Sequence, residues 1–411
     1  MRALRFAVWI VAWIGAAQSA SAQTILTPDS RLSQGAACFS LRCFPTLYGL
    51  DENAAVTGNT GPGVAVQTPS GADVWNVEQT LTNPDYNNLP TPNYPWQQFG
   101  PAAYRGQALL IGGTSPRYNY KDVVYVYARV GGVWTHLQML ALQRPAGYDR
   151  TYIHRIATDG VTAVVSGVRV KDAVDDEAFA QVDLYRRNSD GTFSRRGGFK
   201  PPIPADFLWS SSLKVDGNVI ALSDPGADED SGRVLIYGYD AGRGWRLRTT
   251  LVSNHRQPGA YFGASIGLDG NTLVVAAPGE SDGRPEFGGA VYIYQGAGAS
   301  WTLQQTLHPI EDPRNTGYQF GDEVDVSGER IIVSKSINDF SENIPYHAYI
   351  YERRSSWVPV AELKDNEETN FNEGVRIFGD TAIASGTDWA YGRPTFVFKL
   401  PPLGSLPAVE E

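Results

Sequence analysis

The stretch FGASIGLDGNTLVVAAPGES, from Phe262 to Ser281, contains two short apolar segments on either side of a tight turn. The segments ASIGL and TLVVAA have the length and composition of β-strands. Between them lie Asp269, Gly270 and Asn271, residue types that tolerate the positive φ of a hairpin turn. The stretch therefore predicts a β-hairpin, and this hairpin decides the fold because the chain repeats it.

An aromatic residue, a first strand, a turn and a second strand recur in this order seven times. The repeats begin near Phe44, Phe99, Tyr152, Trp209, Phe262, Phe320 and Phe371, 51–58 residues apart. Each continues with a variable loop, an aromatic-rich third strand such as AVYIY and a fourth strand such as SWTLQQTL. Four short strands per unit, without helical periodicity, predict an all-β fold: a seven-bladed β-propeller of four-stranded antiparallel blades. The recurring aromatic residues are expected in its core.

The seventh unit has no fourth strand of its own, because a Pro-rich, acidic tail (401–411) follows TFVFKL. The segment QTILTP (23–28) resembles the ends of other fourth strands, such as QQTLHP and EQTLTN. Leu26 precedes Phe44 by the same interval that separates Leu81 from Phe99. We therefore expect strand 23–28 to complete blade 7 and close the ring without an open edge. The domain organisation is then one propeller over 23–400 and a flexible tail over 401–411.

The first 22 residues have the features of a cleaved signal peptide. Arg2 and Arg5 precede an apolar run, and Ala20-Ser21-Ala22 fits a small-residue cleavage site. The expected mature chain is secreted or periplasmic and has no membrane span, because no later apolar run approaches membrane length. In an oxidising compartment Cys38 and Cys43 are expected to form a disulfide, in preference to a metal site.

The charge of the chain limits its partners. The formal net charge is −10, and it becomes more negative by two without Arg2 and Arg5. An acidic protein without a basic run is not expected to bind nucleic acid or anionic lipid.

The pattern around Phe262-Gly263 and Ala276-Ala277-Pro278 resembles FG-GAP repeats, and Phe99-Gly100 and Phe320-Gly321 repeat its first half. FG-GAP repeats form the seven-bladed propeller of integrin alpha chains and recur in exported bacterial proteins. The resemblance implies that fold over the whole mature chain, and it points to protein binding or cell adhesion. It is specific for the fold and much less so for function, because propellers host many activities.

The resemblance also raises the question of calcium. Calcium-binding members of the family carry an acidic loop between the FG and GAP strands, whereas this chain has short turns with single carboxylates, Asp159, Asp216 and Asp269. One carboxylate cannot supply the six to eight oxygens that calcium prefers, so no cofactor is expected at these turns. Asp269 is instead expected to bond its own backbone. The loop DPGADEDSG leaves Asp224, Asp228 and Asp230 as weak metal candidates.

The loops between second and third strands, together with the connectors between blades, are long and varied, and they open on one face of a propeller. The opposite turns are minimal, which makes the loop-rich face the candidate binding face. Carboxylates and aromatic residues of this kind suit contacts with a protein or a carbohydrate. The alternative is that the acids only add solubility and the aromatics cover loop bases. The candidate ligand-binding residues are Trp96, Tyr118, Tyr120, Asp228, Asp230, Asp282, Phe340, Trp389 and Tyr391, with Glu280 beside them.

Three functions remain open from the sequence. The first is an exported, non-enzymatic binding or adhesion scaffold. The second is a propeller enzyme, a hydrolase or lyase, that uses channel-facing charges; its candidate residues are Arg155, Lys214, Glu323 and Asp325. The third is a structural envelope module without a small ligand. The enzyme has the least support, because the five histidines fall in different units and no catalytic motif is present.

Overall fold

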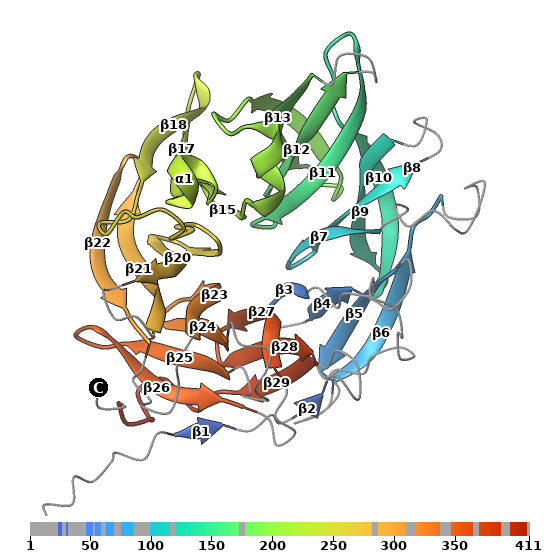
Figure 1. Ribbon diagram of the computed structural model, residues 1–411. Coiled ribbons are helices and arrows are strands. Elements are labelled where there is room, and N and C mark those ends of the chain that lie inside the picture. Colours follow the sequence, from blue (N-terminus) through green and yellow to red (C-terminus); the bar gives the residue numbers. More distant parts are fainter. Residues whose placement is uncertain are drawn as a thin grey trace, which may run out of the picture.

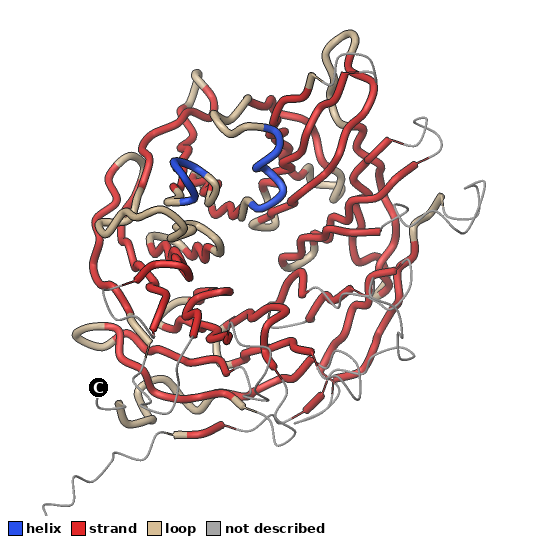
Figure 2. The backbone as a smooth tube through the Cα atoms, viewed as in Figure 1, coloured by secondary structure: helices blue, strands red, loops and turns tan. Residues whose placement is uncertain are grey.

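The protein is a seven-bladed β-propeller, as the repeats predict (Figure 1). The computed structural model describes residues 24–26, 30–31, 47–51, 54–58, 63–69, 75–85, 99–115, 121–171, 177–281, 287–309, 318–337, 347–364, 370–387 and 395–408. Almost all of the described secondary structure is β-strand, arranged around a central axis (Figure 2). No helix among these residues is long and apolar enough to cross a membrane. The signal peptide and both cysteines lie outside the described residues, so cleavage and the disulfide stay predictions.

Each blade is a four-stranded antiparallel sheet whose first strand lies nearest the axis. Blade 1 consists of β3 (Leu47–Leu50), β4 (Ala55–Gly58), β5 (Gly63–Pro69) and β6 (Trp75–Thr82). Blade 2 consists of β7 (Phe99–Arg105), β8 (Ala108–Ser115), β9 (Lys121–Val130) and β10 (Val133–Ala141). Blade 3 consists of β11 (Tyr148–Thr158), β12 (Thr162–Lys171), β13 (Ala178–Arg187) and β14 (Phe193–Phe199). Blade 4 consists of β15 (Leu213–Asp216), β16 (Val219–Asp224), β17 (Arg233–Asp240) and β18 (Gly244–Leu251).

The remaining blades follow the same order. Blade 5 consists of β19 (Ile266–Asp269), β20 (Thr272–Ser281), β21 (Phe287–Ala297) and β22 (Ser300–Leu307). Blade 6 consists of β23 (Tyr318–Ser327), β24 (Arg330–Ile337), β25 (His347–Arg353) and β26 (Trp357–Leu363). Blade 7 consists of β27 (Asn370–Phe378), β28 (Thr381–Thr387), β29 (Thr395–Lys399) and β2 (Ser30–Arg31). Two short helical segments, η3 (Ala205–Ser210) and α1 (Ala227–Asp230), interrupt the strands of the fourth repeat.

The described residues form seven hydrophobic clusters, and each lies between two neighbouring blades. Alternation along β20 shows how one strand serves two clusters. Leu273, Val275 and Ala277 pack toward blade 4, whereas Val274 and Ala276 pack toward blade 6. This follows from the two-residue period of a strand, which sends successive side chains to opposite faces. The apolar second strands therefore hold the ring together on both sides.

Glycines let neighbouring blades approach closely at the start of the third strand. A Cβ on Gly232 would lie 2.2 Å from the carbonyl oxygen of Phe262, the first residue of the FG pair. Gly289 stands in the same relation to Phe320 in the next blade, also at 2.2 Å. Both glycines have positive φ, 83° and 101°. Any side chain here would separate the blades, which gives a physical reason for these glycines in the repeat.

Hydrogen bonds also join the blades at their outer strands. The side chain of Gln305 in β22 donates to the carbonyl of Trp357 at 2.8 Å and accepts from its N–H at 2.7 Å. Gln79 makes the same two contacts with Trp134, both at 2.8 Å. Gln138 pairs in this way with Phe193, the aromatic that replaces Trp in the third repeat. In these three pairs of blades the glutamine fixes where the fourth strand of the next blade begins.

An N-terminal strand completes the last blade and closes the ring, but it lies a few residues later than predicted. Ser30 and Arg31 of β2 pair with Val397 and Phe396 of β29. The predicted segment instead contributes β1 (Ile25–Leu26), which runs parallel to β26 of blade 6. Its backbone carbonyls at Thr24 and Leu26 accept hydrogen bonds from Glu362 and Lys364. Leu26 packs against the cluster between blades 6 and 7, which explains why the apolar residue lies there.

Residues 401–408 of the predicted C-terminal tail contact blade 6. The N–H of Gly404 donates to Glu352 at 3.0 Å, and Leu406 packs against the cluster between blades 6 and 7. Arg330 donates to the carbonyl of Pro401 and forms a buried ion pair with Glu352 at 2.9 Å. The carboxylate of Glu352 is buried and needs a donor on each oxygen. Arg330 donates to one oxygen and Gly404 of the tail donates to the other.

Candidate functional site

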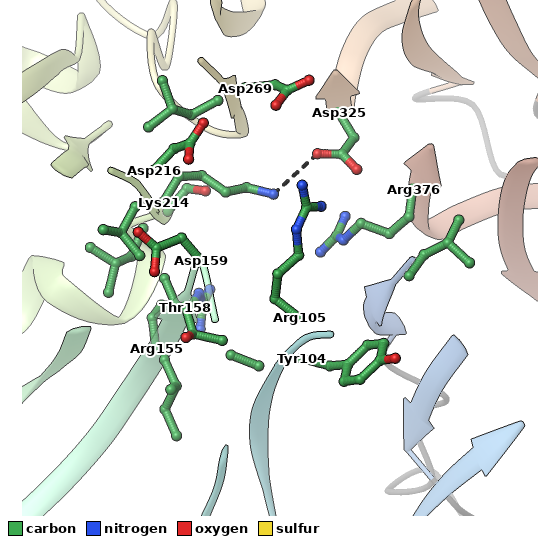
Figure 3. A pocket seen from close by; sticks show the side chains of 18 of the residues that line it. Tyr104, Arg105, Arg155, Thr158, Asp159, Lys214, Asp216, Asp269, Asp325 and Arg376 are labelled. Atoms are coloured by element: carbon green, nitrogen blue, oxygen red, sulfur yellow. Dashed lines mark hydrogen bonds and ion pairs between the residues drawn. The ribbon is translucent and has the colours of Figure 1, made fainter. Parts of the chain in front are cut away.

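The first strands of the blades surround a cavity of about 470 Å³ on the axis of the ring. All four charged residues predicted to face the channel, Arg155, Lys214, Glu323 and Asp325, line it. Three aspartates from the tight turns and two further arginines, Arg105 and Arg376, also line it (Figure 3). The cavity wall is therefore strongly charged with both signs.

The turn aspartates hold neighbouring blades together. The Asp269 carboxylate accepts a hydrogen bond from the N–H of Gly328 in blade 6 at 2.6 Å. Asp216 accepts from Gly270 at 2.5 Å, and Asp159 accepts from Gly217 at 3.0 Å. Asp269 was expected to bond its own backbone, whereas its carboxylate accepts from the next blade, which places an N–H within its reach. These carboxylates close a row of contacts between blades at the inner rim.

The charges named for the enzyme alternative are committed to one another and to the fold. Lys214 Nζ lies 3.2 Å from Asp325 Oδ1, across the channel between blades 4 and 6. The second oxygen of Asp325 accepts from the N–H of Ile377 at 3.1 Å. Glu323 lies 3.5 Å from Arg376 and accepts from Ser265 at 3.3 Å. These contacts give Lys214, Glu323 and Asp325 a structural role that needs no substrate.

On the predicted loop face the structure describes the connectors 142–147, 200–212 and 252–265 and the loop between β16 and β17. Seven of its nine candidate residues lie outside the described residues: Trp96, Tyr118, Tyr120, Asp282, Phe340, Trp389 and Tyr391. The other two, Asp228 and Asp230, lie in the loop between β16 and β17. The connector from β18 to β19 emerges on the same face, because successive strands of a blade are antiparallel.

This loop and this connector contain every non-glycine residue with positive φ in the described part of the chain. Asp228, Glu229 and Asp230 have φ of 53°, 60° and 61°, and Tyr261 has φ of 53°. Left-handed backbone costs roughly 1–2 kcal/mol for each such residue. The surrounding contacts enforce it, because Gly259 and Tyr261 donate their N–H groups to the carbonyls of Glu229 and Asp230 at 3.0 and 2.7 Å. We call Asp228, Glu229, Asp230 and Tyr261 the strained patch.

The strained patch is rigid and accessible at once. Tyr261 is 43% exposed, and Asp228 and Glu229 are exposed as well. Arg256 of the connector pairs with Asp228 of the loop. Strained backbone that the fold over-determines is typical of functional sites, where it fixes the direction of a side chain.

The metal candidates do not gather into a metal site. Asp224 is buried and pairs with Arg233 at 2.8 Å, whereas Asp228 pairs with Arg256. Within the described ranges no group of three or more His, Cys, Asp or Glu side chains could hold a metal ion. Arginine thus pairs with two of the three carboxylates.

Glu280 was a further candidate next to this face, and it is buried. Its carboxylate accepts hydrogen bonds from Ser253 at 2.7 Å and from the Tyr292 hydroxyl. Burial and the Glu280 hydrogen bond raise the pKa of Tyr292 well above its usual value. Asp85, Ser115 and Tyr125 form a similar network in blades 1 and 2, at 2.5 and 3.0 Å. Glu280 therefore anchors the connector and does not face a ligand.

Sequence reasoning missed Tyr261, Arg105 and Arg376. Arg105 is detectable in the repeats, because it stands at the turn position where Asp51, Asp159, Asp216 and Asp269 stand in other blades. Tyr261 and Arg376 carry no comparable signal. The conformation of Tyr261 depends on a contact with Asp230, far away in the sequence.

The comparisons with known proteins agree with the fold. Residues 245–294 match the FG-GAP repeat. The chain is similar to the acylaminoacyl peptidase of Pyrococcus horikoshii, with a TM-score of 0.54 and 11% identity over 91% of this chain and 54% of that chain. A prolyl endopeptidase structure is similar with a TM-score of 0.51 and 11% identity over 90% and 50%. The β-propeller domain of the trilobed protease from Pyrococcus furiosus has a TM-score of 0.48 and 11% identity over 95% and 97%.

These similarities cover only part of the peptidases and have low sequence identity. The chain spans about half the length of the two peptidases with the higher TM-scores. No curated protein matches the sequence. At such low identity the similar structures show the fold alone.

Proposed function

Because the chain is a seven-bladed propeller in which residues 245–294 match the FG-GAP repeat, we propose that it is an exported, non-enzymatic binding scaffold that presents its loop-rich face to a protein or a glycan. The observation that carries the proposal is the strained patch on that face. Three acidic residues and a tyrosine are held there in left-handed backbone by hydrogen bonds between the loop and the connector, which is typical of functional sites. Tyrosine beside carboxylates is a combination that protein and carbohydrate interfaces use.

Export is the second part of the proposal. It rests on the features of residues 1–22, and the acidic charge of the remaining chain supports a partner other than nucleic acid. Adhesion to a surface-bound protein or glycan is the form of binding that the FG-GAP resemblance favours.

The enzyme alternative rests on the channel. Its carboxylates Glu323 and Asp325 are held by Arg376 and Ser265 and by Lys214 and the N–H of Ile377, respectively, so these two proposed groups are already engaged within the fold. The similar solved structures include peptidases, but the reactions in their names belong to those proteins. We therefore place binding ahead of catalysis.

The experiment is a glycan array together with capture of proteins from the exported fraction, using the mature chain. Tyr261→Gly is the decisive variant, because glycine adopts positive φ freely and so keeps the backbone while it removes the ring. Glu323→Gln in the channel is the matched control. Binding that Tyr261→Gly loses and Glu323→Gln keeps supports the proposal. An activity that Glu323→Gln abolishes would favour the enzyme, and the absence of any ligand would favour a structural module.

A further inference from the structure

Arg105 breaks the row of contacts at the inner rim of the channel. Blades 1, 3, 4 and 5 place an aspartate at this turn that accepts a hydrogen bond from the next blade, and blade 6 places Ser327 there, whereas blade 2 places Arg105. Gly160 of blade 3 instead donates to Thr158 of its own blade at 3.0 Å. The hydrogen bond that a turn carboxylate of blade 2 would accept from Gly160 of blade 3 is therefore missing at Arg105.

The guanidinium of Arg105 is held by an aromatic ring. Its Cζ lies 4.8 Å from the centroid of Phe378, which occupies the corresponding turn position in blade 7. Arg105 is exposed, and within the described part of the chain it has no hydrogen bond or ion pair through its side chain. Stacking holds the plane of a guanidinium and leaves the N–H groups at its edge available.

A second guanidinium points to the same place. Arg376 and Phe378 lie two positions apart in β27, so their side chains are on one face of the strand. Figure 3 shows Arg105 and Arg376 both pointing into the cavity, toward one another. Arg376 uses Nη1 for the Val375 carbonyl at 2.6 Å and for Glu323 at 3.5 Å. The nearby Asp325 is already engaged by Lys214 and Ile377.

We propose that the channel binds a small molecule through an oxyanion, a carboxylate in the first instance, between Arg105 and Arg376. Two cations that face one another without a shared carboxylate are stabilised by an anion between them, and arginine binds a carboxylate in a bidentate manner. The cavity of about 470 Å³ has room for more than the anion, and Thr158, Ser211 and Ser212 on its wall suit a hydroxylated body. The carboxylates on the opposite wall limit the ligand to a single anionic group. This site lies in the channel and is independent of the loop face.

The test is isothermal titration of the mature protein at low ionic strength with D-glucuronate. D-glucose serves as the matched neutral sugar, and inorganic sulfate serves as the free oxyanion. Arg105→Gln removes the charge, Arg105→Lys keeps it without the bidentate geometry, and Arg246→Gln on the exposed outer strand β18 is the charge-matched control. Thermal unfolding of each variant checks that the fold is retained.

The expected result is binding of glucuronate and not of glucose, at least about tenfold weaker in Arg105→Gln, intermediate in Arg105→Lys and unchanged in Arg246→Gln. Sulfate binding with the same dependence on Arg105, without glucuronate binding, keeps the oxyanion site and identifies an inorganic anion as its occupant. Equal binding of glucose and glucuronate overturns the proposal. So does binding that Arg105→Gln leaves intact, or no binding of either anion by the wild-type protein.

Discussion

For two single residues, Asp269 and Glu280, the partners in the structure differ from those that the sequence predicts. The turn sequence around Asp269 predicts a local hydrogen bond for its carboxylate, yet the carboxylate accepts from the N–H of Gly328 in the next blade. Glu280 follows a buried strand as an apparent loop residue, yet Ser253 and Tyr292 enclose it. In both cases the partner comes from another part of the chain, and no local pattern encodes that proximity.

The strain in the strained patch is testable at Glu229. We expect Glu229→Gly to raise the free energy of unfolding by about 0.5–1 kcal/mol, because glycine relieves the left-handed backbone at a smaller entropic cost. Glu229→Ala is the control, since alanine keeps the strain. Urea unfolding at neutral pH measures both. Equal stability of the two variants would show that the backbone at Glu229 is not strained.

Asp122 gives the protein a pH-dependent contact between blades 2 and 3. Its carboxylate accepts from the N–H of Ile153 at 2.8 Å and from Thr114 at 3.2 Å, and burial raises its pKa to about 6. A raised folded pKa contributes stability below the unfolded value of 3.8, and this contribution is lost as pH rises through about 6. We expect the wild type to lose roughly 3 kcal/mol over this window, relative to Asp122→Asn. Urea unfolding of both proteins across the window measures it, and parallel pH profiles would contradict it.

At the scale of elements, two sets of side-chain contacts join several of the neighbouring blades. In the inner row, a turn carboxylate accepts a hydrogen bond from an N–H in the corresponding turn of the next blade. In the outer row, a glutamine side chain bonds the N–H and the carbonyl of an aromatic residue in the next blade. The aromatic positions were readable from the repeats because every blade needs them in its core. The glutamines were not, because their partner is a backbone group, which leaves no mark on the sequence.

The inner row has a measurable contribution at Asp269. We expect Asp269→Ala to lower the free energy of unfolding by about 1.5–3 kcal/mol, because the N–H of Gly328 loses a charged acceptor. Asp269→Asn keeps an acceptor oxygen and should recover much of that loss. Chemical unfolding of the three proteins decides it. If alanine and asparagine behave alike, the bond to Gly328 contributes little.

At the scale of the whole molecule, the architecture was predictable and the place of the closing strand was less so. Seven aromatic-led repeats require seven blades, and the absence of a fourth strand in the last repeat requires closure from elsewhere. The match of QTILTP to other fourth strands predicted that residues 23–28 pair with blade 7. Which residues pair depends on the geometry of blade 7, and in the structure Ser30 and Arg31 pair with β29. The loop-rich face was predictable from the repeats, whereas the strained patch on it depends on long-range hydrogen bonds.

Ring closure by the N-terminal segment can be tested by truncation. A chain that begins at Leu32 lacks β1 and β2, exposes Leu26's site between blades 6 and 7 and leaves the edge of β29 unpaired. We expect its unfolding free energy to fall by at least about 2 kcal/mol relative to a chain that begins at Gln23. Calorimetry of the two chains measures the difference. Identical transitions would mean that the ring is stable without its closing strand.

The central claim is that the protein binds its partner through the loop-rich face. The most direct measurement compares wild-type, Tyr261→Gly and Glu323→Gln proteins on a glycan array and in capture from the exported fraction. We predict a ligand that wild type and Glu323→Gln retain and that Tyr261→Gly loses while its thermal unfolding stays cooperative. A ligand that Tyr261→Gly binds as tightly as wild type would contradict the claim.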